Sequence, residues 1–261
     1  MIERFQRLPE ALRAAARWER LGDHRVPAML VHPDWESGSS APAVLWMHGR
    51  TVRKEHDPAR YLRLMRAGIG FCAVDLPGHG ERGTPPLTGP HHTVRVLRQM
   101  HDEIDSLIDA LRQLGVFDMK RLAIGGMSAG GMVALARLCS EHRFTCAAVE
   151  ATTGSWTHPA HANMFPGCPR EDLAGLDPLT RIDGWREIPL LAIHTVGDEL
   201  VSIEGQRQFI TALRGRYHDP SLIEFVEYTQ TGAPYEHIHF GKMSADAKQR
   251  QRDFFARWLE S

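Results

Sequence analysis

The chain has 261 residues, which is long enough for one large α/β domain or for two small ones. Its 31 Lys and Arg residues nearly balance its 32 Asp and Glu residues, so no global electrostatic field favours nucleic acid or a membrane surface. The longest apolar runs have the length of a strand, far below the ~20 residues that a membrane-spanning helix needs.

The N-terminus and the cysteines indicate the compartment. The first eight residues, MIERFQRL, alternate charged and apolar side chains and lack the apolar core of a secretory signal. The cysteines form no C-x-x-C pair, and most of them lie in strand-like or helix-like segments, where buried free thiols are expected. They are Cys72, Cys139, Cys146 and Cys168. We therefore expect a cytoplasmic enzyme.

The first third of the chain predicts two helices and three strands. A run rich in Ala and Arg over about 9–21 predicts a helix with Leu12 and Trp18 facing inward. The continuous apolar runs at 43–47 and 70–74 are typical of strands that are covered on both faces. The other elements expected here are strands at 24–31, 43–47 and 70–74 and a helix at 58–67.

The most clearly predicted helix lies at 93–114. Its apolar residues fall at steps of three and four, and Gly115 ends it. The remaining expected elements are strands at 121–124, 146–149, 190–195 and 223–228, a helix directly after 121–124, and a closing helix at about 245–259.

Strands and helices alternate along the chain, which predicts a mostly parallel, doubly wound sheet with helices on both faces. The exception is 151–188, which contains Trp, Phe, Pro and Gly but no long periodic segment. This stretch is too short for an independent domain and is interpreted as a cap. We therefore expect a single domain over 1–261 with a small cap at about 151–188.

The sequence GMSAG at 126–130 follows an apolar strand-like run and precedes a small-residue helical pattern. Strand, sharp turn and helix with a serine at the turn form the G-x-S-x-G nucleophile elbow. Glycines flank the turn because larger side chains would clash across it, and the strained backbone lifts the Ser128 hydroxyl off the carboxyl edge of the sheet. There it lies at the positive end of a helix, whose free N–H groups can stabilise an oxyanion. Ser128 is therefore the predicted nucleophile.

A serine hydroxyl needs a base that takes its proton, and the base needs an acid that orients it. In open α/β sheets such groups lie at the carboxyl ends of later strands. Asp198 stands in a turn just after the strand at 190–195, and His237 and His239 share a loop after the last strand. The order serine, acid, histidine is the order that the elbow motif requires. Glu150 is an alternative acid, and these residues alone leave the choice of histidine open.

Together these motifs resemble those of α/β-hydrolases, and within them those of small serine esterases related to dienelactone hydrolases and to the catalytic domains of prolyl oligopeptidases. Asp198 lies in a sequence similar to H-G-x-x-D-x-x-V, with Thr195 where that pattern has glycine. The pair HG at 48–49 resembles the opening of an oxyanion loop, in which the histidine has a supporting role. The segment 75–82 resembles D-x-P-G-H-G-x-S, with Arg in place of the serine.

The resemblance implies an α/β-hydrolase fold and acyl transfer to water through a Ser128 acyl-enzyme, with Asp198 orienting the histidine. The common arrangement in the family, a histidine, one or two residues and then Phe-Gly, implies His237 as the base. A minority form with the histidine directly before the phenylalanine implies His239. Dienelactone hydrolases themselves carry cysteine at the elbow, where this chain has serine.

The resemblance also implies an oxyanion hole and a substrate pocket. The backbone N–H of Ala129 and that of Arg50, or alternatively Thr51, would form the oxyanion hole. Apolar side chains dominate most small-molecule pockets. Three aromatic residues of the cap are candidates to line an apolar acyl pocket: Trp156, Phe165 and Trp185.

We therefore expect a carboxylesterase that cleaves small carboxylic esters and needs no metal or organic cofactor. The expected partner is a small-molecule ester, with no nucleic acid and no membrane span, and homodimerisation stays open. Alternatives on the same residues are an acyltransferase or perhydrolase and a hydrolase of thioesters or short peptides. A further alternative is a non-catalytic relative that binds a small ligand, which would not react with a fluorophosphonate.

Overall fold

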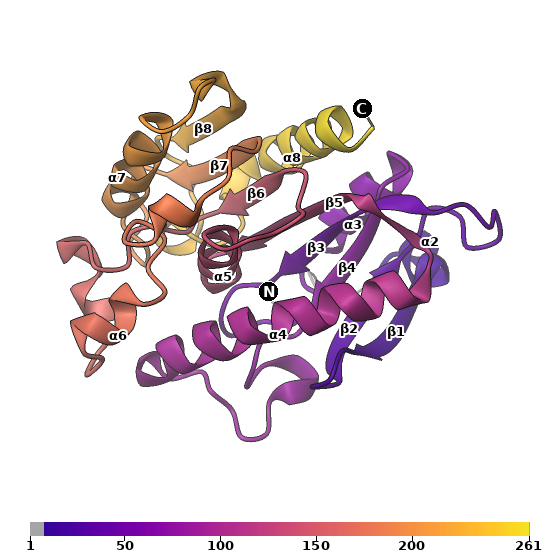
Figure 1. Cartoon of the computed structure of the whole chain (residues 1–261), viewed down its shortest axis with the longest axis horizontal. Coiled ribbons are helices and arrows are strands. Elements are labelled where there is room, and N and C mark those ends of the chain that lie inside the picture. Colours follow the sequence, from indigo (N-terminus) through magenta and orange to yellow (C-terminus); the bar gives the residue numbers. More distant parts are fainter. Residues whose placement is uncertain (1–7, 261) are drawn as a thin grey trace.

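A computed structural model describes residues 8–260. Nearly all of the N-terminal sequence that argued against a secretory signal lies in 1–7 and is outside the described residues. Within 8–260, eight strands form one sheet in the order β1-β2-β4-β3-β5-β6-β7-β8 (Figure 1). The strands are β1 (Ala16–Leu21), β2 (Val26–Val31), β3 (Ala41–Met47), β4 (Gly70–Val74), β5 (Phe117–Met127), β6 (Ala147–Glu150), β7 (Leu190–Thr195) and β8 (Ile223–Tyr228).

The sheet is mostly parallel, as predicted. Only the pairs β1–β2 and β2–β4 are antiparallel, and every other pair of neighbours runs parallel. The carboxyl ends of β3, β5, β6, β7 and β8 therefore meet at one edge of the sheet. Ligands of open α/β sheets bind at that edge.

Helices cover both faces of the sheet, because side chains of the central strands alternate between two apolar cores. Leu45 of β3 packs into one core with residues of α4, α5 and α7, whereas Val44 and Trp46 pack into the other with residues of α2, α3 and α8. The helices are α2 (Glu10–Ala15), α3 (Pro58–Arg66), α4 (Thr93–Leu114), α5 (Ala129–Leu138), α6 (Arg170–Ala174), α7 (Ile203–Arg214) and α8 (Ser244–Leu259).

One predicted helix is wrong over half of its length. The helix expected at 9–21 ends at Ala15, and β1 follows at once. Leu12 is buried as expected, but Trp18 is exposed and lies opposite Met29 in the β1–β2 ladder. Pairing with β2 satisfies backbone groups along the edge of an apolar strand. This outweighs the helix propensity of the Ala- and Arg-rich run, which amounts to tenths of a kcal/mol per residue.

The segment 151–188 lies between β6 and β7 and contains no strand (Figure 1). Its elements are the short 3₁₀ helix η3 (Pro159–Met164), α6 and the 3₁₀ turn η4 (Ile182–Gly184). Apolar side chains of this segment, among them Trp156 and Leu173, belong to the core that also contains α4 and α5.

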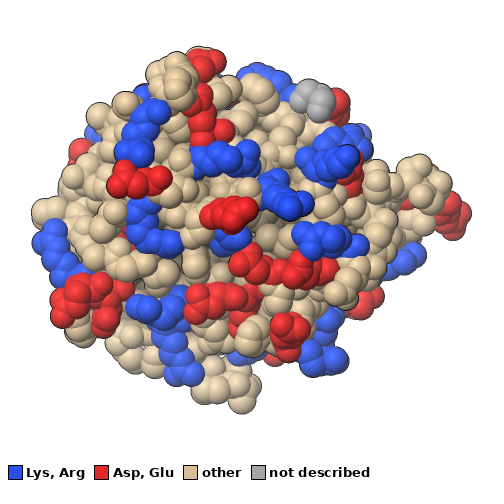
Figure 2. Space-filling view, viewed as in Figure 1, with Lys and Arg blue, Asp and Glu red and all other residues tan. Residues whose placement is uncertain are grey.

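The surface carries no large area of a single charge on the face that Figure 2 shows, where Lys and Arg alternate with Asp and Glu. Over 8–260, none of the helices combines the length and the apolar composition that crossing a membrane requires.

Candidate active site

Ser128 lies at the turn between β5 and α5 in a conformation that is rare for a residue with a side chain, with φ 51° and ψ −117°. Its N–H donates to the carbonyl oxygen of Glu150 at 2.9 Å. A Cβ atom at Gly126 would lie 2.4 Å from the carbonyl carbon of Gly130, and one at Gly130 would lie 2.1 Å from the carbonyl oxygen of Met47. The turn therefore requires glycine at both positions. The strained serine costs about 1–3 kcal/mol, which the surrounding packing must offset.

Asp198 follows β7, and His237 lies in the loop after β8. The Nδ1 atom of His237 donates to Oδ2 of Asp198 at 2.7 Å, and both side chains are buried. A proton on Nδ1 leaves Nε2 of His237 as an acceptor. His237 and Ser128 line the same cavity. The structure thus brings the predicted serine, the predicted acid and the first of the two candidate bases to one place.

Four donors surround the carboxylate of Asp198. Its Oδ1 accepts from the backbone N–H groups of Leu200 (2.9 Å) and Val201 (2.8 Å). The Nε2 atom of His194 lies 3.3 Å from Oδ2 and 2.9 Å from the carbonyl oxygen of Val201, which assigns a proton to Nε2. Burial alone would raise the pKa of Asp198, but the hydrogen bonds from His194 and His237 outweigh burial and hold this pKa below its ordinary value. Asp198 is therefore ionised at neutral pH.

The loop that carries His237 is strained. A positive φ at a residue other than glycine is uncommon and costs about 1–3 kcal/mol where the structure imposes it. Four residues of this loop adopt one: Tyr235 (57°), Glu236 (46°), His239 (59°) and Phe240 (55°).

The carboxylate of Glu236 holds this loop together. It accepts hydrogen bonds from the backbone N–H and the hydroxyl of Thr231, both at 2.7 Å, and from the N–H of Gly232 at 2.7 Å. We call this set the Glu236 brace. It fixes the residue next to His237, and no motif in the sequence indicated it, because glutamate at a loop position is usually solvated.

The alternative base and the alternative acid have other contacts. Nε2 of His239 lies 2.6 Å from Nε2 of His56, two residues before α3, and both rings line the cavity of Ser128. The carboxylate of Glu150 accepts from the buried guanidinium of Arg60 at 2.7 Å. No hydrogen bond between His239 and Asp198 is present among the described residues.

The segment after β3 lies directly against the nucleophile. A Cβ atom at Gly49 would lie 3.4 Å from Cβ of Ser128. Arg50, Thr51 and Ala129 all line the cavity. Ala129 is the first residue of α5, so its N–H is one of those that a helix leaves without an internal partner. The residues predicted for the oxyanion hole therefore lie around Ser128.

The side chain of Arg50 fastens this segment to the loop before α4. Its Nη2 atom donates to the carbonyl oxygens of Gly89 (2.6 Å) and Thr88, and its Nη1 atom donates to the hydroxyl of Thr93. We call this set the Arg50 clamp. No carboxylate pairs with Arg50 in the part of the chain that the structure describes. The sequence did not indicate the clamp, because its two sides are about 40 residues apart.

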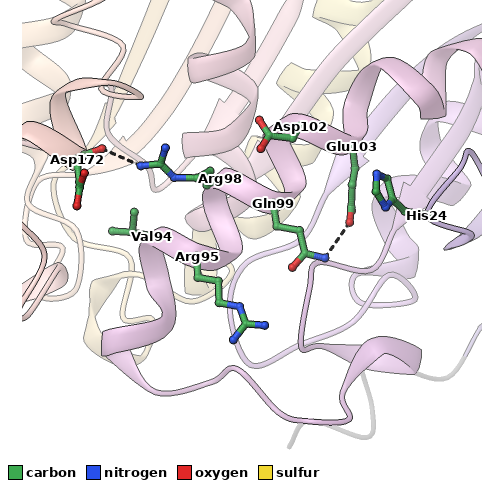
Figure 3. A pocket seen from close by; sticks show the side chains of 8 residues that line it. All are labelled: His24, Val94, Arg95, Arg98, Gln99, Asp102, Glu103 and Asp172. Carbon is green, nitrogen blue, oxygen red and sulfur yellow. Dashed lines mark hydrogen bonds between the residues drawn. The ribbon is translucent and has the colours of Figure 1, made fainter.

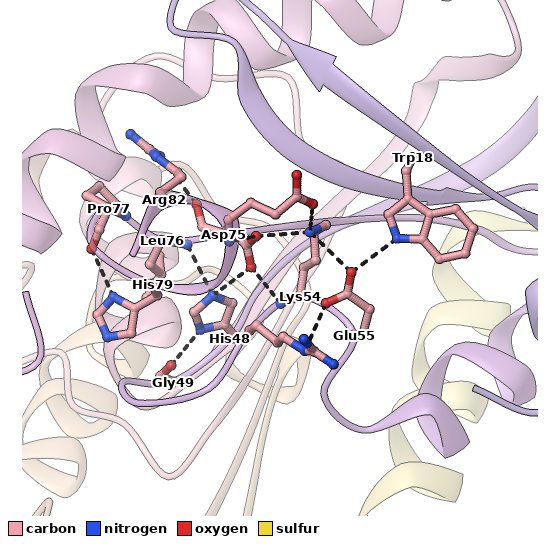
Figure 4. Close-up of polar contacts among 12 residues, drawn as sticks. Trp18, His48, Gly49, Lys54, Glu55, Asp75, Leu76, Pro77, His79 and Arg82 are labelled. Carbon is pink, nitrogen blue, oxygen red and sulfur yellow. Dashed lines mark hydrogen bonds and ion pairs between the residues drawn. The ribbon is translucent and has the colours of Figure 1, made fainter. Parts of the chain in front are cut away.

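A second set of polar contacts supports the segment that follows β3 (Figure 4). Nε2 of His48 accepts from the N–H of Leu76 at 3.1 Å, so Nδ1 carries the proton and donates to the carbonyl oxygen of Gly49 at 2.6 Å. The buried ammonium of Lys54 donates to Asp75 at 3.0 Å, and the backbone N–H of Lys54 donates to the same carboxylate at 2.8 Å. These contacts agree with the supporting role expected for His48.

The cavity beside Ser128 has a volume of about 510 Å³. This volume lies within the range that suits a small-molecule ligand. Its apolar lining comes from the segment after β3, from the elbow and α5, from η3 and from the loops that carry the acid and the base. The larger apolar residues are Val52, Met127, Met132, Met164, Leu200, Val201 and Ile238. The sequence did not single out the methionines, because Met in a strand or helix is usually a core residue.

The three aromatic residues expected in the pocket lie elsewhere. Trp156 and Phe165 are buried and stack with ring centroids 6.0 Å apart. Trp185 packs edge-on against Phe209 of α7. None of the three belongs to the lining of the Ser128 cavity, because their rings point into the core under the 151–188 segment. Within 151–188, the residues that line the Ser128 cavity instead come from η3.

A separate recess of about 570 Å³ lies along α4 and faces α6 (Figure 3). Arg98 of α4 donates a hydrogen bond to the carbonyl oxygen of Asp172 in α6 at 3.2 Å. Within α4, Gln99 donates to Glu103 at 2.9 Å. Its lining contains neither a serine nor a cysteine. The cavity of Ser128 is the candidate active site because it also contains His237, whose ring donates to Asp198.

Comparisons with known proteins identify the family of the chain. Residues 60–261 match the profile of the prolyl oligopeptidase family. Human prolyl endopeptidase FAP is 30% identical over 202 residues, which cover 71% of this chain and 26% of that protein. The chain thus spans about a quarter of the length of the prolyl endopeptidases that it matches. The esterase YjfP of Escherichia coli is 23% identical over 210 residues, which cover 76% of this chain and 84% of that protein.

Solved structures show the same fold. The crystal structure of TT1662 from Thermus thermophilus superposes with a TM-score of 0.74 at 23% identity and covers 94% of this chain and 99% of that one. A puromycin-hydrolyzing peptidase of Mycobacterium tuberculosis superposes with a TM-score of 0.74 at 20% identity and covers 96% of this chain and 40% of that one. The expected α/β-hydrolase fold is confirmed, and the match over 60–261 places the chain in the prolyl oligopeptidase family of hydrolases.

Proposed function

We propose that the chain hydrolyses carboxylic esters through a Ser128 acyl-enzyme, with His237 as general base and Asp198 as the acid that orients it. The observation that carries this proposal is the 2.7 Å hydrogen bond that His237 donates to Asp198, because the ring of His237 lines the same cavity as the strained Ser128. The Nδ1 proton of His237 is committed to Asp198, so Nε2 is free to take the Ser128 proton.

The mechanism has two symmetric halves. In the first, Nε2 of His237 takes the proton of Ser128 as its Oγ attacks the ester carbonyl, and then returns the proton to the leaving alcohol. In the second, a water molecule replaces the alcohol and releases the acid. Ionised Asp198 stabilises the imidazolium that forms in both halves. The N–H groups of Ala129 and Arg50 would bind the oxyanion, each contributing about 3–4 kcal/mol to the lowering of the barrier.

Two observations favour an ester over a peptide as the substrate. The relative named as an esterase matches over 84% of its own length, whereas the prolyl endopeptidase matches over 26%. The cavity is also of a size that suits a small molecule. Peptide hydrolysis on the same residues is the second candidate, because prolyl endopeptidases are among the relatives, and chromogenic dipeptide amides test it.

A matched pair of histidine variants tests the proposal. His237→Ala should reduce the hydrolysis of p-nitrophenyl acetate on the order of 10³-fold or more, because the base is lost. His239→Ala, two residues away in the same loop, should keep most of the activity. A folded His239→Ala that is inactive beside an active His237→Ala would assign the base to His239. Equal, near-normal activity of both variants would refute a histidine base in this loop.

A further inference from the structure

Exposed apolar side chains gather beside the candidate active site. Large apolar side chains are usually buried, and a contiguous exposed patch marks a site of binding. Within 8–260, four of the six large apolar residues that are exposed come from two loops, the one that carries Asp198 and the one that carries His237. The six are Trp18, Leu114, Val196, Leu200, Tyr235 and Ile238.

The two loops form one continuous edge of the cavity. The N–H of Glu199 donates to the carbonyl oxygen of Tyr235 at 3.0 Å, so the loops are bonded to each other next to the Asp198–His237 pair. Leu200 and Ile238 are 47% and 37% exposed, and both line the cavity of Ser128. These two residues therefore face solvent and the cavity at the same time.

Backbone hydrogen bonds hold both residues at the rim before any ligand arrives. The N–H of Leu200 donates to Asp198 at 2.9 Å, and the N–H of Ile238 donates to the carbonyl oxygen of Pro234 at 3.2 Å. Ordering of the surface would thus cost little on binding. We call Leu200 and Ile238 the apolar shelf.

The apolar lining continues from the shelf towards the nucleophile. Met127 precedes Ser128 in the chain, Met132 lies one turn into α5, and Met164 reaches the cavity from η3. Methionine side chains are flexible and adapt to apolar groups of different shape. An acetyl group would leave most of a cavity of about 510 Å³ unfilled.

We infer that the apolar shelf binds the hydrophobic group of the substrate, so that the substrate class is esters with a medium-length alkyl chain or an aromatic ring. This inference rests on the proposed function of Ser128, Asp198 and His237. The hydrophobic group belongs either to the acyl part or to the alcohol part of the ester, and both present the same chemistry to the shelf.

Two substrate series test the inference and separate the two sources of the chain. One series is p-nitrophenyl esters from acetate to octanoate, and the other is alkyl acetates from methyl to octyl. Each methylene group that leaves water on the shelf should raise kcat/KM about fourfold, until the chain extends beyond the rim. The series in which kcat/KM rises identifies the part of the ester that lies on the shelf.

The variants are Leu200→Ser and Ile238→Thr, singly and together, with Leu114→Ser as the control. Leu114 is 41% exposed and does not line the cavity. In the series that rises, the ratio compares kcat/KM for the eight-carbon member with kcat/KM for the two-carbon member. This ratio should fall about tenfold in the double variant and stay unchanged in Leu114→Ser. Both substitutions are at exposed positions, and a melting curve verifies folding.

The outcome separates the inference from the proposed function. If the wild type reacts with a fluorophosphonate at Ser128 and hydrolyses the two-carbon ester, but the ratio is the same in the double variant and in the wild type, the shelf is refuted and the mechanism stands. A ratio that falls equally in Leu114→Ser also refutes the shelf. If Ser128 of the folded wild type does not react, the proposed function fails, and the inference fails with it.

Discussion

Asp198→Asn replaces one oxygen of the proposed acid by an amide nitrogen and tests how the acid acts. In the wild type, Oδ1 accepts from two backbone N–H groups, and Oδ2 accepts from His237 and lies near the donor of His194. The amide oxygen can replace only one of these two acceptors. If it keeps the backbone bonds, the NH₂ group faces Nδ1 of His237, and the proton of the imidazole must move to Nε2. That tautomer cannot take the proton of Ser128.

The expected loss in kcat is about 10⁴-fold, the loss found when a triad acid is neutralised and the histidine tautomer changes, which corresponds to about 5 kcal/mol in the activation barrier. The assay is p-nitrophenyl acetate hydrolysis by Asp198→Asn, with Glu150→Gln as the comparison and a melting curve for each protein. A folded Asp198→Asn with more than a tenth of the wild-type kcat would refute the reasoning. If Glu150→Gln were then inactive, the acid would be Glu150.

Of three further predictions, two concern residues beside the site and one concerns a residue outside it. Arg50→Lys keeps the charge but not the fork of the clamp, so kcat should fall on the order of tenfold or more at a nearly constant KM, and an unchanged kcat would exclude a role of the clamp in placing the oxyanion donor. Glu236→Ala removes the acceptor of the brace, so kcat and Tm should both fall; a normal kcat at a lowered Tm would make the brace purely structural. Burial, with Arg186 and Arg137 nearby, lowers the pKa of His142 from 6.5 to about 4. The unfolded chain therefore binds this proton more readily, and stability falls as the pH drops from 6.5 towards 4. His142→Asn should flatten the curve of Tm against pH in that window, and an unchanged slope would contradict this assignment.

The sequence predicted the bounds of those helices and strands whose hydrophobic pattern fits only one kind of element. The helix at 93–114 and the strands at 70–74, 190–195 and 223–228 have the predicted bounds. The helix repeats its apolar residues every three or four positions, and 70–74 and 190–195 are apolar over most of their length, so each of these patterns leaves one way to bury it. The N-terminal helix failed after Ala15, because whether an edge strand forms depends on a partner that lies elsewhere in the chain.

The candidate site was predictable where the chemistry is local. Ser128 and Asp198 follow strands directly, so the strand ends place them. The choice between His237 and His239 depends on four residues with positive φ and on a brace to Thr231, which the sequence does not show. Trp156 was expected in the pocket only because it is an aromatic residue of the 151–188 segment. Residue type does not show whether an aromatic ring points into a cavity or into a core.

The most direct test of the mechanism is mass spectrometry of the protein after reaction with a fluorophosphonate. We expect one adduct per chain, located on the peptide that contains Ser128, absent in Ser128→Ala and formed more slowly in His237→Ala. An adduct at another residue, or no adduct on the folded wild type, would contradict a Ser128 nucleophile.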